Sequence, residues 1–141
     1  MRFIAIAALA AGLCLPALPG RAQVTGDNFG GGKTSDLAAL CGATQTDQYV
    51  VSAVNFCHGF LMGVGQLHSA LTQPGVGVRP YFCLPNPRPS LDQVRGAFVG
   101  WVAANPQYGA TPAVEGVTRF GEATYPCPPS QTRASRRGAT Q

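Results

Sequence analysis

The sequence predicts a small all-α protein, a bundle of about four helices stapled by two disulfides. Apolar residues recur at helical spacing in several segments, and the alternation of apolar and polar residues typical of strands is absent. The chain has 141 residues, enough for one domain. An even number of cysteines remains once an N-terminal segment is set aside, as in small exported proteins.

Residues 1–22 are predicted to be a secretory signal peptide. A positively charged start precedes an apolar run over residues 3–18, and small residues lead to a cleavage site after Ala22. The run is broken by proline and falls short of the roughly 20 apolar residues of a membrane span. Lipid attachment at Cys14 is the alternative, which Leu13 disfavours because a small residue is needed there. We therefore expect a periplasmic or secreted protein without a stable membrane span.

The mature chain is predicted to hold one compact domain, residues 36–127, between two flexible ends. Residues 23–35 are rich in glycine and read as a flexible leader, and the polar residues 128–141 read as a disordered basic tail. Between Gln23 and Pro128, five basic residues stand against six acidic ones. A nucleic-acid-binding protein would cluster basic residues on one face of its fold, so this balance argues against a nucleic-acid partner.

Two helices are expected in the first half of the domain. A short one covers residues 37–41, capped by Ser35 or Asp36 and closed by glycine. The second covers residues 50–71 and carries a wide apolar stripe with steps of three and four. Its glycines cost helix propensity, about 1 kcal/mol each relative to Ala, and glycines four residues apart would let a neighbouring helix come close.

A long loop and two further helices complete the domain. The loop, residues 72–89, exceeds the roughly 12–15 residues beyond which loops are usually functional or disordered, and Cys83 indicates that it is tied down. The third helix begins at a capping box formed by Ser90 and Gln93 and ends at an Asn-Pro pair. The fourth begins at Pro112 and closes at a Tyr-Pro-Cys sequence.

The four cysteines of the mature chain are predicted to form two disulfides, for which three pairings are possible. A zinc site is the competing interpretation. Metal sites generally use closely spaced ligands, and the chain has no C-x-x-C or H-x-x-x-H spacing, so we expect no metal. The cysteines are Cys41, Cys57, Cys83 and Cys127.

No motif for catalysis or cofactor binding stands out. Cys57 and His58 resemble a nucleophile and its base, but neighbours on a helix diverge by about 100° and do not face each other. His58 and His68 are not spaced as a metal pair. The Gly-rich residues 30–33 lack the preceding strand of a phosphate loop. We expect neither an enzyme nor a cofactor.

The long loop is the candidate binding surface. It contains residue types that are enriched at protein interfaces, and a loop held by prolines and a disulfide loses little entropy on binding. The alternative is that Phe82 and Leu84 plug the bundle, and both interpretations can hold for different residues. The candidate partner-binding residues are Arg79, Tyr81, Phe82 and Arg88.

Several short motifs occur in a characteristic order over residues 36–127. They are Leu40-Cys41, Cys57-His58-Gly59-Phe60-Leu61-Met62-Gly63, Cys83-Leu84-Pro85, Trp101-Val102-Ala103-Ala104-Asn105-Pro106 and Tyr125-Pro126-Cys127. In this order they resemble the Rap/Tai family of type VI secretion amidase immunity proteins. The resemblance implies a small α-helical periplasmic protein, often dimeric, that binds and blocks a peptidoglycan amidase. No toxin-contacting residue carries over from the motifs.

Our prediction is therefore an exported inhibitor of a cell-wall amidase, without catalysis, whose partners are the toxin and a possible second copy of the chain. We favour pairing Cys57 with Cys83, which would fold the loop back along the second helix, and Cys41 with Cys127, which would tie the first helix to the end of the domain. Two rival functions remain: a periplasmic acid-stress chaperone, disfavoured by the small number of acidic residues, and an enzyme built on Cys57 and His58.

Overall fold

The structure, a computed structural model, describes residues 23–129, so the predicted signal peptide and most of the predicted tail lie outside the described residues. Within that range the chain is all-α with two disulfides and no strand, which confirms the predicted fold class. One 3-10 turn, η1, separates the last two helices. The elements are α1 (Asn28–Gly31), α2 (Thr34–Cys41), α3 (Val50–Leu71), α4 (Leu91–Ala104), η1 (Pro106–Tyr108) and α5 (Ala113–Thr124).

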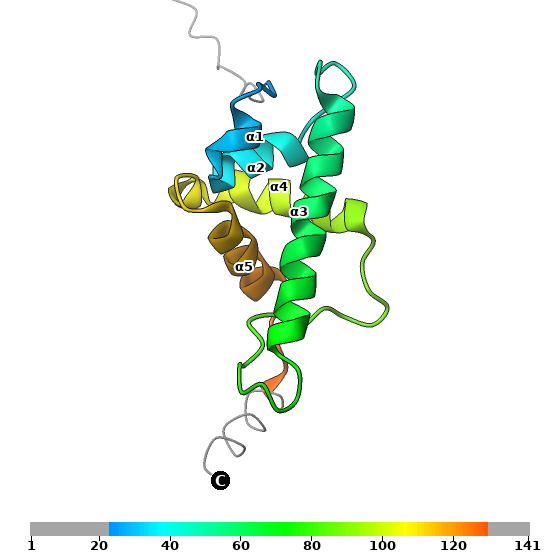
Figure 1. Cartoon of the computed structure of the whole chain (residues 1–141), viewed down its shortest axis with the longest axis vertical. Helices are drawn as coiled ribbons and strands as arrows, with labels where there is room; N and C mark the ends of the chain where they lie inside the picture. Colours follow the sequence, from blue (N-terminus) through cyan, green and yellow to red (C-terminus); the bar gives the residue numbers. More distant parts are fainter. Residues whose placement is uncertain (1–22, 130–141) are drawn as a thin grey trace, which may run out of the picture.

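The long helix α3 runs most of the length of the molecule, and the other helices gather against part of it (Figure 1). Helices α1 and α2 lie at one end, and α2 contacts α1, α3, α4 and α5. The long loop after α3 and the last described residues lie at the other end. The bundle is therefore thickest around α2, while the C-terminal part of α3 has loop as well as helix beside it.

Helix α3 has the predicted bounds, residues 50–71, but only a narrow side of it is buried. Its buried residues, Ala53, Cys57 and Leu61, recur at steps of four and face the other helices. Among the described residues, α3 alone is long and apolar enough to cross a membrane by length and composition, a test that core helices of soluble proteins also pass. Only 17% of its most apolar window is buried, so much apolar surface of α3 faces outward.

The capping box predicted for α4 is present. The Gln93 N–H donates to Ser90 Oγ over 3.2 Å, and the Ser90 N–H donates to Gln93 Oε1 over 2.7 Å. These bonds occupy two backbone donors that a helix start leaves free. Helix α4 ends at Ala104, immediately before the Asn-Pro pair, as the sequence predicts.

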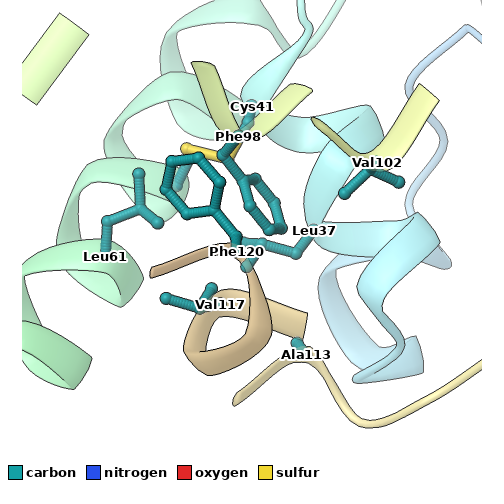
Figure 2. Close-up of a cluster of buried hydrophobic side chains, with 9 residues drawn as sticks. Leu37, Cys41, Leu61, Phe98, Val102, Ala113, Val117 and Phe120 are labelled. Atoms are coloured by element: carbon teal, nitrogen blue, oxygen red, sulfur yellow. A yellow bond between two sulfur atoms is a disulfide. The ribbon is translucent and has the colours of Figure 1, made fainter. Parts of the chain in front are cut away.

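The core closes where α2, α3, α4 and α5 meet (Figure 2). Phe98 of α4 is fully buried and packs edge to face on Phe120 of α5, with ring centroids 5.5 Å apart. Leu37 of α2 and Val117 of α5 pack in the same cluster. Burying a side chain of this kind contributes about 1.5–3 kcal/mol, so these few contacts hold the helices together.

The flexible leader predicted for residues 23–35 differs from the structure, in which Val24 and Thr34, near the two ends of this segment, are buried. Val24 is only 5% exposed, and Thr34 is fully buried. The Thr34 N–H donates to Thr111 O, and the Ala113 N–H donates to Gly32 O, both over 2.8 Å. The N–H groups at the starts of α2 and α5 thus donate to the segment that precedes the other helix. Helix α2 consequently begins at Thr34 with Lys33 as its N-cap, and the predicted caps, Ser35 and Asp36, lie inside the helix.

Candidate interaction site

The disulfide pairing that we favoured from the sequence is wrong. The structure joins Cys41 to Cys57 and Cys83 to Cys127, with Cα–Cα distances of 5.1 and 4.8 Å. Because the link between α2 and α3 is short, residues 42–49, the end of α2 lies beside the second turn of α3. Cys41 therefore meets Cys57, and Cys83 is left to meet the chain that leaves α5.

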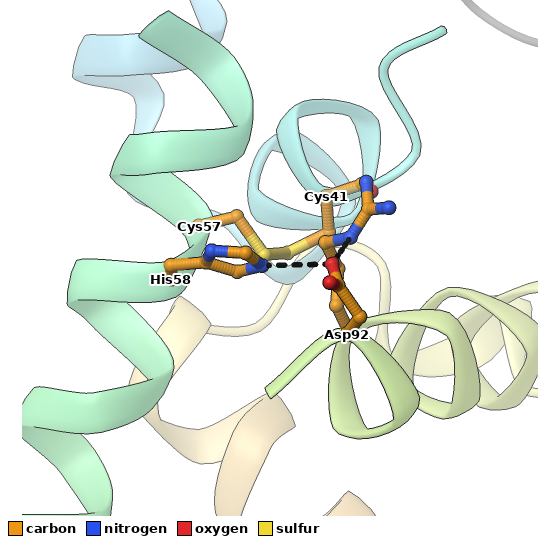
Figure 3. Close-up of a disulfide and its surroundings, with 5 residues drawn as sticks. Cys41, Cys57, His58 and Asp92 are labelled. Atoms are coloured by element: carbon orange, nitrogen blue, oxygen red, sulfur yellow. Dashed lines mark hydrogen bonds and ion pairs between the residues drawn. A yellow bond between two sulfur atoms is a disulfide. The ribbon is translucent and has the colours of Figure 1, made fainter. Parts of the chain in front are cut away.

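The neighbourhood of Cys57 and His58 does not form a nucleophile site in the structure (Figure 3). The Cys57 sulfur is bonded to Cys41, so it offers no thiol. His58 Nε2 instead lies 3.3 Å from Asp92 Oδ1, and Arg95 Nε lies at the same distance from that oxygen. An Arg95 Nη1–H also donates to Cys41 O over 3.0 Å. This charged group, in which Asp92 pairs with Arg95 and lies beside His58, joins α3 and α4 next to the disulfide.

The long loop after α3, residues 72–89, is held at its centre. Cys83 is bonded to Cys127, and the Cys83 N–H donates to Tyr125 O over 2.8 Å. Both cysteines are half-buried. One disulfide and one backbone bond thus fix the loop against the segment that follows α5.

Phe82, the residue before Cys83, holds the loop against His68 of α3. The two rings are stacked with centroids 4.0 Å apart, and Phe82 is 9% exposed. On its other side Phe82 lies against Gly121, where an added Cβ would come within 2.5 Å of Phe82 Cδ1. His68 Nε2 accepts the Tyr81 N–H over 3.1 Å, so the ring is neutral with its proton on Nδ1. Burial lowers the pKa of His68 below its ordinary 6.5, which favours the same neutral form.

Between α3 and this loop lies a groove of about 560 Å³, within the roughly 300–1,000 Å³ range of ligand pockets. We call it the α3–loop groove. Most of its lining is apolar, and Arg88 is the charged residue among the described side chains that line it. Its lining includes Met62, Gly65 and Ser69 of α3, Leu84 and Arg88 of the loop, and Phe120 of α5.

The four predicted partner-binding residues separate into two groups. Phe82 is buried and acts as the plug that the alternative interpretation described. Arg79, Tyr81 and Arg88 are exposed, and Tyr81 leaves 54% of its surface accessible. Neither arginine forms an ion pair with any residue in the range 23–129. Their role in partner binding stays a prediction.

Sequence reasoning did not identify the α3 wall of the groove. In the sequence, Gly65 is one of the glycines that lower the helix propensity of residues 50–71, and Ser69 belongs to no motif. A Cβ at Gly65 would meet no atom within 4 Å, so the missing side chain leaves open space in the groove. The signal in the sequence that could have indicated the groove is Gly65 itself, a residue without a side chain in the part of α3 that precedes the long loop.

In the part of the chain that the structure describes, no group of three or more His, Cys, Asp or Glu side chains could hold a metal ion. A model of one protein family, described as Rap1a immunity proteins, matches residues 33–127. No curated protein and no solved structure matches the chain significantly. The matched range begins at α2 and ends at the last cysteine, so it contains both disulfides and the α3–loop groove.

Proposed function

The chain belongs to the Rap1a immunity protein family, and from this membership we propose that it binds and inhibits a peptidoglycan amidase effector of a type VI secretion system. The family match over residues 33–127 is the observation that carries the proposal. Family membership itself indicates an immunity protein against a secreted effector. The amidase as target comes from the order of the sequence motifs.

The two disulfides and the family indicate an exported protein, since disulfides persist in oxidising compartments. We propose that this compartment is the periplasm and that residues 1–22 are removed as a signal peptide after Ala22. We further propose that α3 remains in the bundle after export. The buried disulfide of Cys57 to α2 and the burial of Ala53 and Leu61 support this, because a membrane-spanning α3 would lose those contacts.

We also propose that the chain acts without catalysis. A cysteine nucleophile needs a free thiolate beside a base. Cys57 is bonded to Cys41, and His58 faces Asp92. Inhibition by binding needs only a complementary surface, and the exposed residues of the long loop offer one.

A second copy of the chain is a further proposed partner. Its site would be the outward face of α3, which we define as Phe56, Gly59, Gly63 and Leu67. All four are exposed. Phe56 packs edge to face on Phe29 of α1, whereas a Cβ at either glycine would meet no atom within 4 Å, so the part of this face around the glycines is open in the described chain. Light scattering should report a dimer that Leu67→Glu dissociates. Val51→Glu is the matched control, because Val51 is exposed but lies about 160° around α3 from Leu67.

Inhibition of purified amidases tests the main proposal. Mature chain, residues 23–141, is titrated into a panel of purified peptidoglycan amidases, and release of cleaved muropeptides is measured. We expect one amidase to be inhibited at one chain per enzyme, with no inhibition by reduced and alkylated chain. Failure to inhibit any amidase contradicts the proposal. Suppressed aggregation of many unrelated unfolded proteins would instead favour a chaperone.

A further inference from the structure

The α3–loop groove has the size and the lining of a site for another molecule's side chain. Its volume of about 560 Å³ could hold several side chains, and its lining is mostly apolar. Leu84 of the loop and Met62 of α3, both of which line it, are 40% and 50% exposed. Covering such surface is favourable because it removes apolar area from water.

The charge of the groove restricts what can fill it. Arg88 lines it, no carboxylate among residues 23–129 does, and Arg88 has no ion-pair partner there. Arg79 adds a second unpaired positive charge on the same loop. An occupant with an apolar group next to an anionic group matches this arrangement, because a guanidinium binds a carboxylate with two parallel hydrogen bonds.

The walls are held in place before binding. Cys83–Cys127 fixes the loop, and Phe82 is stacked between His68 and Gly121. A surface that is already ordered loses less conformational entropy when a partner binds. This rigidity favours a partner that inserts a side chain over one that must reshape the loop.

The chain's own C-terminal residues do not match the groove. Residues 130–141 follow Cys127 closely in the sequence. They contain three arginines, no acidic residue and no apolar side chain larger than Ala. Such a segment would bring positive charge toward Arg88 and little apolar surface.

We propose that the α3–loop groove receives a surface segment of the amidase effector in which an apolar side chain lies next to a carboxylate, and that Arg88 pairs with this carboxylate. The inference rests on the proposed function. It places the effector on α3 and the long loop, apart from the charged group around Asp92.

The first test uses 1-anilinonaphthalene-8-sulfonate as the probe, because it joins an aromatic body to an anionic group. We expect one probe molecule to bind per chain, measured by fluorescence. Gly65→Leu should abolish binding, since the new side chain enters the groove, and Arg88→Glu should weaken it about tenfold or more. The control is Gly100→Leu, an exposed helix glycine with open space around it. Equal binding by all variants, or none by the native chain, overturns the proposal.

The second test adds the amidase that the native chain inhibits. The amidase should displace the probe, and Gly65→Leu should weaken inhibition about tenfold or more while Gly100→Leu leaves it unchanged. An amidase that is inhibited equally by both variants and leaves the probe bound overturns this inference but not the proposed function. If no amidase is inhibited, the proposed function fails, and a probe still bound in the groove identifies a site for a small amphiphilic anion instead. Melting temperatures of all variants confirm that they are folded.

Discussion

The two halves of α3 are held to the rest of the molecule by different means. In the N-terminal half, Ala53 and Cys57 are fully buried against other helices, and the disulfide to Cys41 lies inside the packed core. In the C-terminal half Leu61 still packs against other helices, and beyond it the long loop lies beside α3, fixed by the half-buried disulfide of Cys83 and by Phe82 on His68. Other helices pack directly against the N-terminal half of α3. Beside the C-terminal half, the tethered loop leaves the α3–loop groove open. Stability and binding are thus assigned to different halves of one helix.

Removing each disulfide in turn should give the largest contrast between the halves. The chain-entropy model alone ranks the longer loop first, at about 4 kcal/mol for Cys83–Cys127 against about 3 for Cys41–Cys57. We expect burial to reverse this order, because the Cys41→Ala, Cys57→Ala variant also leaves a cavity in the core, for a total of about 4–5 kcal/mol. Urea unfolding of the two double variants measures both values.

Hydrogen exchange of backbone amides shows which part of the molecule each disulfide stabilises. Loss of Cys83–Cys127 should speed exchange of amides in residues 72–89 while those of α2 stay protected. The Cys83→Ala, Cys127→Ala variant should be the more stable of the two double variants. A lower free energy of unfolding for it than for the Cys41→Ala, Cys57→Ala variant would contradict the assignment of stability to the N-terminal half.

Gly121→Ala should have the next largest effect. Its Cβ would lie 2.5 Å from Phe82 Cδ1, so the Phe82 ring must leave its place on His68 or α5 must shift. Overpacking of this kind costs about 1–3 kcal/mol. Thermal unfolding measures the cost, and NMR contacts between the Phe82 and His68 rings report the displacement. Unchanged contacts with an unchanged melting temperature would show that the loop is not pinned at this point.

Gly63→Ala makes the same chemical change on the outward face of α3 and should have the opposite sign. A Cβ there meets no atom within 4 Å, and Ala is about 1 kcal/mol more favourable than Gly inside a helix. We expect the free energy of unfolding of dilute, monomeric protein to rise by about that amount. A loss of stability would mean that this face is already packed in the monomer.

The sequence was sufficient for the elements whose signals are local. Steps of three and four fixed α3 at residues 50–71, and the Ser90–Gln93 capping box placed the start of α4. The all-α class with two disulfides followed from the same patterns. These predictions succeeded because helix periodicity and capping depend on residues only a few positions apart.

The missed features depend on residues that are distant in sequence. Thr34 and Thr111 pair across the fold, which turned a Gly-rich leader into part of the domain. The cysteine pairing depends on how the short link turns α3 against α2, which spacing alone does not determine. The α3–loop groove is lined from α3, the long loop, α4 and α5, so no single segment carried its pattern.

The smallest predicted effect concerns pH and the contact of His68 with the loop. The folded-state pKa of His68 is below 6.5 because of burial, while the unfolded chain titrates near 6.5. Between these two values the unfolded chain binds more protons, so stability rises with pH. The stabilisation from neutral His68 is therefore complete above 6.5 and is lost as pH falls from 6.5 through the folded-state pKa.

Unfolding of the native chain and of His68→Gln across about pH 4 to 8 checks this prediction. Glutamine can still accept the Tyr81 N–H but does not titrate, so the variant should lose this part of the pH dependence. Identical pH profiles for the two proteins would contradict the prediction that neutral His68 stabilises the contact with the loop. If the profiles differ as expected, protonation of His68 also breaks the bond from Tyr81 and loosens one wall of the α3–loop groove. Acid would then weaken the half of α3 that we assign to binding before the half that we assign to stability.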